Sequence, residues 1–370
     1  MPTKIIFILI AVLAIAGYFI YQPFSVKEDH VIVQEFEVQK HVPEPIYKTP
    51  SSDKNIKWQP GHYMMLGYNM KDRNDWSAIF DNDYFRGGQR VYLWSDLEPT
   101  KGNYDFSRIE SDLDFLKSNG KYLVIEPWDT FFWDKGVAVP DYILSDPEYN
   151  GGVVYRSNKA GSLSKRYNTA LMDRYIALTR ALGERFDKKE YISAFIITET
   201  AMNLGEGSED FNKERYHEQL IRLVKETAKA FPTTPIIIYG NWYPGVGGQA
   251  LLNELGDESY KCGVGWGGPD IMPGANIWGY DIIRNYKEKV AIGLAAQWDS
   301  YDGRWPAEEL LSFSVDNLSS NFVFWLGAER RNEGGLSFKQ DVIPTINKFK
   351  GKINTSIPEN LESGKVGMCE

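Results

Sequence analysis

Carboxylate side chains recur in this sequence where strands are expected to end. The run from Ile192 to Ile197 is short, apolar and rich in β-branched residues, as in a parallel strand buried on both faces. Glu199 stands two residues after this run. Because barrels of alternating strands and helices hold catalytic side chains at the C-terminal ends of their strands, Glu199 is interpreted as catalytic rather than as a solvated loop residue. Further carboxylates lie near the ends of other expected strands or directly after them: Glu126, Asp129, Asp270, Asp299 and Asp302.

Paired carboxylates suit the cleavage of a glycosidic bond. One carboxylic acid protonates the leaving oxygen, and a second carboxylate acts as nucleophile or as base toward water. Glu199 is the expected general acid. Asp299 is the expected partner, because its strand faces that of Glu199 across the barrel mouth, and Asp270 is the second choice. The remaining carboxylates are expected to bind substrate (Glu126, Asp129) or to pair with Lys and Arg.

Tryptophans accompany these acids at the same strand ends. Aromatic residues make up 14% of the chain, with 11 Trp and 22 Tyr, and their flat faces can stack on sugar rings. Tyr239, Asn241 and Gln297 are placed to orient sugar hydroxyls. Six tryptophans are expected to form a ring around a sugar-binding cleft: Trp94, Trp128, Trp242, Trp266, Trp298 and Trp325.

Alternating strands and amphipathic helices must position these side chains. Helical spacing is found at 109–116, 171–182 and 220–224. The pattern predicts a single (β/α)8 TIM barrel, with an open doubly wound sheet as the alternative, although no G-x-G-x-x-G follows an early strand. A long segment from Asp129 to Lys165 is expected to wall the substrate groove. The eight expected strands are 62–68, 89–94, 122–128, 191–199, 235–242, 262–266, 290–298 and 322–326.

The first 57 residues differ from the rest of the chain. Lys4 precedes an apolar run, which predicts either a cleaved signal peptide or an uncleaved membrane anchor within residues 1–22. Residues 23–57 read as a flexible tether, 58–350 as the catalytic barrel and 351–370 as a C-terminal tail. Both readings of the leader place the barrel outside the cytoplasm, either secreted or periplasmic or attached to the outer face of the cytoplasmic membrane.

Composition excludes several other functions. The formal charge of −9, without a basic run, argues against nucleic acid as a partner. The four histidines show no paired spacing, so neither a metal centre nor another cofactor is expected. With two cysteines, Cys262 and Cys369, one disulfide is possible, but the fold must depend on its core.

One stretch carries a family resemblance. Residues Trp94 to Phe106 resemble the W-x-x-x-E-P-x-x-G-x-Y-D-F motif after strand two in retaining glycoside hydrolases of clan A. The resemblance implies an acid/base at the end of strand four, which Glu199 matches, although Thr198 stands where the family has Asn. It also implies a nucleophilic Glu after strand seven, where this chain has Gln297. Trp325 is similar to the tryptophan that floors the first sugar site.

Two rival functions remain open at this level. A sugar-binding barrel that has lost catalysis would use the same aromatic ring, with Gln297 marking the lost nucleophile. A barrel enzyme of different chemistry, such as a lyase, is the other. The sequence selects neither the sugar nor the linkage, and it does not distinguish endo from exo action.

Overall fold

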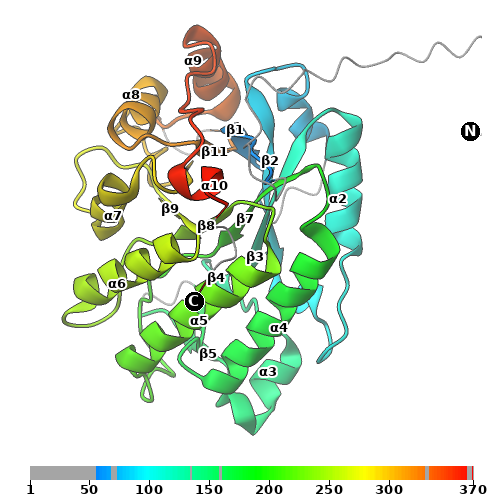
Figure 1. The fold of residues 1–370 in the computed structure, drawn as a ribbon, viewed down its shortest axis with the longest axis vertical. Coiled ribbons are helices and arrows are strands. Elements are labelled where there is room, and N and C mark those ends of the chain that lie inside the picture. The colour runs from blue at the N-terminus through cyan, green and yellow to red at the C-terminus, as the bar shows by residue number, and fades with distance from the viewer. Residues whose placement is uncertain are drawn as a thin grey trace, which may run out of the picture. The chain divides into compact units, whose positions relative to one another are not determined.

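Eight parallel strands close into a barrel (Figure 1). The computed structural model describes residues 56–67, 73–133, 136–157, 161–329, 333–364 and 369. Around the barrel the strands follow the order β1, β11, β10, β9, β8, β7, β3, β2. The expected (β/α)8 barrel is therefore confirmed, and each of the eight expected strands overlaps an observed one. Their bounds are β1 Gly61–Met65, β2 Phe85–Leu93, β3 Tyr122–Trp128, β7 Ile192–Ile197, β8 Ile236–Tyr239, β9 Gly265–Gly268, β10 Ile292–Ala296 and β11 Phe322–Leu326.

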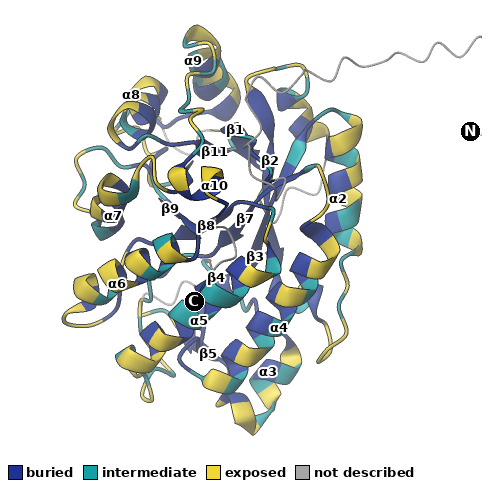
Figure 2. Ribbon diagram, in the orientation of Figure 1, coloured by how far each residue is buried: buried dark blue, intermediate teal, exposed yellow. Residues whose placement is uncertain are grey.

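Helices surround the strands, with their exposed faces turned outward and their buried faces toward the strands (Figure 2). The helical spacings seen in the sequence correspond to α2, α4 and α5. Shorter 3₁₀ and π turns complete the connections at Arg73–Ile79, Pro147–Tyr149, Phe313–Asn317 and Phe338–Val342. The α-helices are α1 Trp94–Leu97, α2 Ser107–Ser118, α3 Asp141–Ser145, α4 Thr169–Phe186, α5 Lys213–Ala230, α6 Gly248–Lys261, α7 Trp278–Tyr286, α8 Ala307–Ser312, α9 Ile343–Lys348 and α10 Glu359–Glu362.

Apolar side chains on both faces of the strands explain why they read as continuous apolar runs. Those on the outer face pack beneath the helices in one large core. A second cluster fills the barrel with side chains from alternate positions, as expected for a packed barrel interior. Its strand members include Tyr63, Val124, Ile196, Ile237, Tyr239, Ala295, Phe322 and Phe324.

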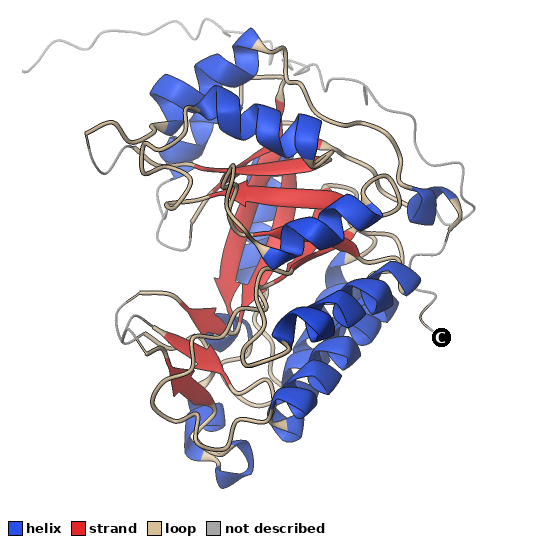
Figure 3. Cartoon of the chain, turned by 90° about the vertical axis from the view of Figure 1, so that its left-hand side faces the viewer, coloured by secondary structure: helices blue, strands red, loops and turns tan. Residues whose placement is uncertain are grey.

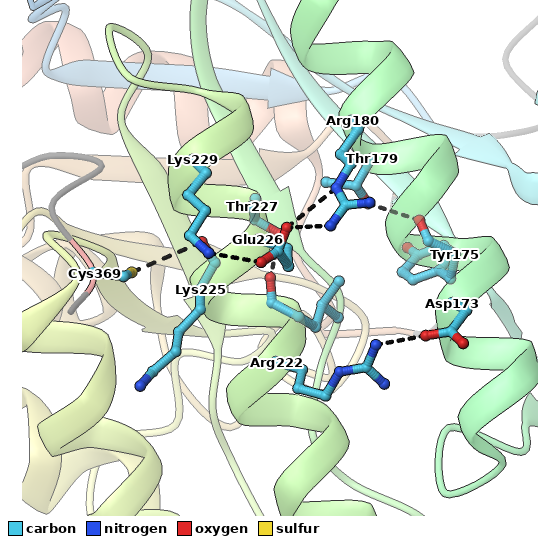
Figure 4. A network of polar contacts seen from close by, with 11 residues as sticks. Asp173, Tyr175, Thr179, Arg180, Arg222, Lys225, Glu226, Thr227, Lys229 and Cys369 are labelled. Carbon is cyan, nitrogen blue, oxygen red and sulfur yellow. Dashed lines mark hydrogen bonds and ion pairs between the residues drawn. The ribbon is translucent and has the colours of Figure 1, made fainter.

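Helices α4 and α5 are joined on their outer side by ion pairs (Figure 4). Arg180 of α4 donates to Glu226 of α5, which also accepts from Lys229 one turn further on. Arg222 pairs with Asp173 in the same way. Such exposed pairs are worth at most about 1 kcal/mol each, so the buried apolar faces of these helices hold them against the strands.

The long connection after β3 forms a small sheet of its own. Strands β4 (Thr130–Phe131), β6 (Ser162–Ser164) and β5 (Val153–Tyr155) pair antiparallel in that order. Figure 3 shows this sheet beside the barrel strands. A bridge between Arg156 and Leu204 ties it to the segment that follows β7. The long connection after β3 is therefore a folded unit with a sheet of its own.

Both ends of the described chain pack against the barrel. Ile56 and Trp58 belong to the interior cluster together with Leu361 of α10. The Trp58 indole donates to the carbonyl of Thr355, and the amide of Asn360 donates to the carbonyl of Lys289. The segment expected to be a tail after residue 350 therefore packs on the barrel in its described part.

A disulfide joins Cys262, directly after α6, to Cys369 near the C-terminus. It closes a separation of 107 residues. The expected leader and nearly all of the tether, residues 1–55, lie outside the described residues. Within the described part of the chain, no helix is both long enough and apolar enough to cross a bilayer.

Candidate active site

Glu199 lies two residues past the end of β7, at the C-terminal mouth of the barrel. Asn241, two residues past β8, donates through Nδ2 to Oε2 of Glu199 at 2.6 Å. Below it, the Arg166 guanidinium donates to the backbone carbonyl of Glu199 at 2.9 Å. The backbone and one carboxylate oxygen are thereby fixed, while the side chain borders a cavity. Such a group is positioned to exchange a proton with a bound molecule.

The electrostatics of Glu199 suit a proton donor. Burial raises its pKa above the usual value, and the charge of Asp299 adds to the rise. The hydrogen bond from Asn241 and the positive charges of Arg156 and Arg166 oppose it. The net shift is upward, which keeps a proton on the carboxyl group at a higher pH than for a solvated glutamate.

Asp270 and Asp299 lie in the loops that follow the neighbouring strands β9 and β10, and both line the same cavity. Asp270 is half-buried, and burial raises its pKa to about 7, with Glu199 and Asp299 both contributing. Asp299 is exposed. The structure thus brings Glu199, Asp270 and Asp299 within electrostatic reach of one another at the mouth.

Two cavities border these acids and share Trp242. The Asp270 cavity, of about 400 Å³, is lined by Asp270, Asp299, Asn241 and Tyr280, among others. The Glu199 cavity, of about 530 Å³, is lined by Glu199, Phe132, Arg156 and Tyr243, among others. Trp242 is 38% exposed, so its ring is accessible from the mouth. Together the two cavities provide room for a ligand beside the acids at the barrel mouth.

Glu126 is buried inside the barrel and lines neither cavity. The Gln89 amide donates a short hydrogen bond to it. Burial raises its pKa to about 8, and the charge of Glu199 contributes. Its expected role as a substrate ligand is therefore corrected to that of a protonated group beneath the site.

Asp129 is also a structural residue, contrary to the expectation. It is buried, and both its carboxylate oxygens accept from Arg166 while Ser164 donates to one of them. Since Arg166 also donates to the carbonyl of Glu199, the Asp129–Arg166 pair fixes the segment that follows β7. With its lone pairs engaged and no exposed surface, Asp129 does not contact a substrate.

The expected ring of six tryptophans is wrong in three positions. Trp94, Trp266 and Trp325 are at most 1% exposed, so none offers a face to a sugar. The Trp94 indole donates to Glu98, four residues later in the motif that carries the family resemblance, and the Trp325 indole donates to His62. All three tryptophans are core residues, and the indole N–H groups of Trp94 and Trp325 have hydrogen-bond partners inside the protein.

The other three tryptophans differ among themselves. Trp242 lines both cavities. Trp128 is 7% exposed and packs edge-on against Phe132 and Trp133 of the β3 loop. Trp298 is half-buried and lies outside the lining of both cavities. Trp242 is thus the tryptophan placed to stack on a substrate.

The three residues expected to orient sugar hydroxyls also differ in where they lie. Asn241 lies in the Asp270 cavity and binds Glu199. Tyr239 is buried in the barrel interior, so its expected contact with sugar hydroxyls is wrong. Gln297 donates to the carbonyl of Pro269 at 2.7 Å, which ties the β9 and β10 loops together.

Sequence reasoning missed the residues of the β3 loop and the barrel interior. Phe132 and Arg156 line the Glu199 cavity from that loop, and Gln89 reaches Glu126 from β2. The length of the loop indicated that it builds the site, but nothing in its sequence singles out Arg156. Among the described residues, no cluster of three or more His, Cys, Asp or Glu could hold a metal ion.

Comparisons with known proteins bear on the fold. No protein-family model matches the sequence, and no curated protein matches it either. The structure is similar to the catalytic domain of beta-amylase from Paenibacillus polymyxa, with a TM-score of 0.53 and 11% identity over 80% of this chain and 100% of that one. It is also similar to endo-glycoceramidase II from Rhodococcus sp. in its lactosyl-enzyme intermediate, with a TM-score of 0.52 and 11% identity over 81% and 80% of the two chains.

A third likeness is to beta-galactosidase from Bacillus circulans sp. alkalophilus, with a TM-score of 0.51 and 10% identity. It covers 85% of this chain and 55% of that one. The chain therefore has the (β/α)8 barrel fold that these structures share. At these identities the likeness concerns the fold, and any activity must be argued from the site.

Proposed function

We propose that the protein is a glycoside hydrolase that cleaves glycosidic bonds in a polysaccharide or oligosaccharide. The observation that carries the proposal is the coupled set of Glu199, Asp270 and Asp299 at the barrel mouth. Burial and mutual repulsion raise the pKa of Glu199 and bring that of Asp270 to about 7. Carboxyl groups with different affinities for protons, beside an exposed Trp242, supply what acid/base cleavage of a glycoside needs.

Glu199 is the general acid in this proposal. Its Oε2 is occupied by Asn241, and within the described residues no hydrogen bond engages Oε1. Asp299 is the nucleophile or base, because Asp270 holds its proton into the neutral range whereas Asp299 is exposed at the cavity edge. Asp270, which keeps its proton to a higher pH, then binds substrate hydroxyls as a hydrogen-bond donor and acceptor.

The alternative of a sugar-binding barrel without catalysis is tested by the same experiment. The purified protein is incubated with a panel of polysaccharides and aryl glycosides, and released reducing ends are counted beside the Glu199→Gln variant. Hydrolysis of one substrate class by the wild type, abolished in the variant, supports the proposal. Binding of a glycan without release of reducing ends would identify the binding protein instead.

Export is the second part of the proposal. It rests on the apolar run after Lys4 and on the disulfide between Cys262 and Cys369, since disulfides persist mainly in oxidising compartments. Residues 1–57 fused to a reporter that is active only outside the cytoplasm should export it. A reporter retained in the cytoplasm would contradict this part and leave the hydrolase proposal standing.

A further inference from the structure

Arg156 is the one arginine that lines the Glu199 cavity. It belongs to the loop between β5 and β6, and its backbone is fixed by the bridge to Leu204 and by a hydrogen bond to the carbonyl of Gly161. Its guanidinium lies over the ring of Phe132, at 5.3 Å from the centroid. Glu199 senses its positive charge. Arg156 is thus held at the wall of the cavity, beside the proposed acid.

The guanidinium of Arg156 forms no salt bridge with any described residue. Within the described residues no ion pair and no side-chain hydrogen bond involves it, and its Nε is buried without an acceptor. The other two buried or half-buried arginines around the mouth are satisfied, Arg166 by Asp129 and Arg174 by Glu98. Burying an unpaired N–H donor is unfavourable, so a ligand that accepts from Arg156 would gain this contact.

The two cavities differ in the charged side chains that line them. The Asp270 cavity holds two carboxylates, Asp270 and Asp299, and no cation. The Glu199 cavity holds Arg156 and, besides Glu199 itself, no other charged side chain. A substrate that spans both would place its developing positive charge beside the aspartates and a negative substituent beside the arginine.

We propose that Arg156 binds an anionic substituent, a carboxylate or a sulfate ester, on the sugar unit in the Glu199 cavity. The planar fork of arginine matches both groups in a bidentate geometry that lysine does not offer. The substrate class would accordingly be an acidic glycan. The inference rests on the proposed function in treating the bound glycan as a substrate. Binding at Arg156 can nevertheless be tested without turnover.

The test measures binding in a Glu199→Gln background, where hydrolysis does not interfere and where no glutamate charge remains for Arg156 to tune. The first probe pair is an oligogalacturonate and its methyl ester, and the second is a carrageenan oligosaccharide and its desulfated form. Calorimetry gives the dissociation constants with Arg156, with Arg156→Gln and with Arg156→Lys. Arg185→Gln on α4, which removes the same charge from an exposed ion pair with Glu110, is the matched control.

We expect at least about tenfold tighter binding of one charged probe than of its neutral partner, lost in Arg156→Gln. Arg156→Lys should retain only part of the preference, and the Arg185 control should retain all of it. The pair that shows the preference identifies carboxylate or sulfate. Equal binding of charged and neutral probes, or a preference that survives Arg156→Gln, would overturn the site, as would failure of both charged probes to bind.

The outcomes separate this inference from the hydrolase proposal. A preference that depends on Arg156, in a protein that releases no reducing ends from any glycan, would support the anion site and reject the hydrolase. Hydrolysis of neutral glycans alone, unaffected by Arg156→Gln, would support the hydrolase and reject the anion site. If Arg156→Gln does not fold, Arg156→Lys decides: a weakened preference for the charged probe supports the site, and an unchanged preference rejects it.

Discussion

The side-chain amide of Asn241 donates to Oε2 of Glu199 at 2.6 Å and links the ends of β8 and β7. Its Oδ1 accepts from the backbone amides of Ala201 and Trp242. Through these hydrogen bonds, Asn241 fixes one carboxylate oxygen of Glu199 relative to the loops after β7 and β8. The bond that it donates also favours the charged form of Glu199. A substitution at Asn241 should therefore change the pKa of Glu199.

Asn241→Asp should shift the activity profile toward higher pH. The variant keeps the acceptor at Oδ1 but replaces the donor with a second carboxyl group, so the pKa of Glu199 should rise further. An acid must be protonated to act, and activity is lost as pH rises through its pKa. The alkaline limb of kcat/KM should move up by about one pH unit or more. An unmoved limb would show that Glu199 is not the titrating acid.

Glu126 should make the protein less stable as pH rises. Its pKa in the folded state is about 8, above the ordinary value of 4.5, so the folded state retains a proton that the unfolded state releases. The free energy of unfolding should fall by a few kcal/mol between about pH 4.5 and 8.

Glu126→Gln should remove most of this pH dependence, because the neutral amide can still accept from Gln89. Denaturant unfolding at pH 5 and pH 8 measures it. Glu214→Gln on the exposed face of α5 is the control and should keep the wild-type slope. A slope unchanged in Glu126→Gln would contradict the assignment of a buried, protonated Glu126.

Trp242→Ala and Trp325→Ala should have opposite effects. Trp242 is 38% exposed at the shared wall, so its loss should weaken saccharide binding roughly tenfold with little change in stability. Trp325 is fully buried and bonded to His62, so its loss should cost about 3 to 5 kcal/mol of folding stability. Thermal unfolding and glycan binding measured on both variants check this, and a reversed pattern would reject the present account of the cleft.

Cys369→Ser should lower the free energy of unfolding by roughly 2 to 4 kcal/mol, because the disulfide to Cys262 closes a long loop. Denaturant titrations of wild type and variant, with and without reductant, measure the loss. Reductant should destabilise the wild type to the level of the variant and leave the variant unchanged. A wild type insensitive to reductant would mean that the bridge does not stabilise the fold.

The barrel could be predicted because strand and helix patterns are local. An apolar run such as Ile192–Ile197 has no stable place except between two packed layers, and Glu199 at its end follows from that. The tryptophans show the limit. Trp94 and Trp242 both stand at strand ends, and what separates them is a partner such as Glu98 for the indole of Trp94.

Contacts between distant segments explain the other differences. From its place in the sequence, Asp129 is expected to be a site carboxylate. In the structure it accepts a hydrogen bond from Arg166, which lies 37 residues later. Arg156 belongs to a loop whose path depends on pairing with Leu204. Such pairs leave no periodic trace in the sequence, so their roles emerged only with the fold.

The most direct test of the proposed mechanism compares Glu199→Gln with Asp299→Asn on a natural glycan and on an aryl glycoside with a good leaving group. On the glycan, Glu199→Gln should reduce turnover at least about a hundredfold, since the amide cannot donate the proton. The aryl glycoside needs little protonation, so it should partly rescue Glu199→Gln and should not rescue Asp299→Asn. Near-normal turnover of the glycan by Glu199→Gln would contradict the central claim.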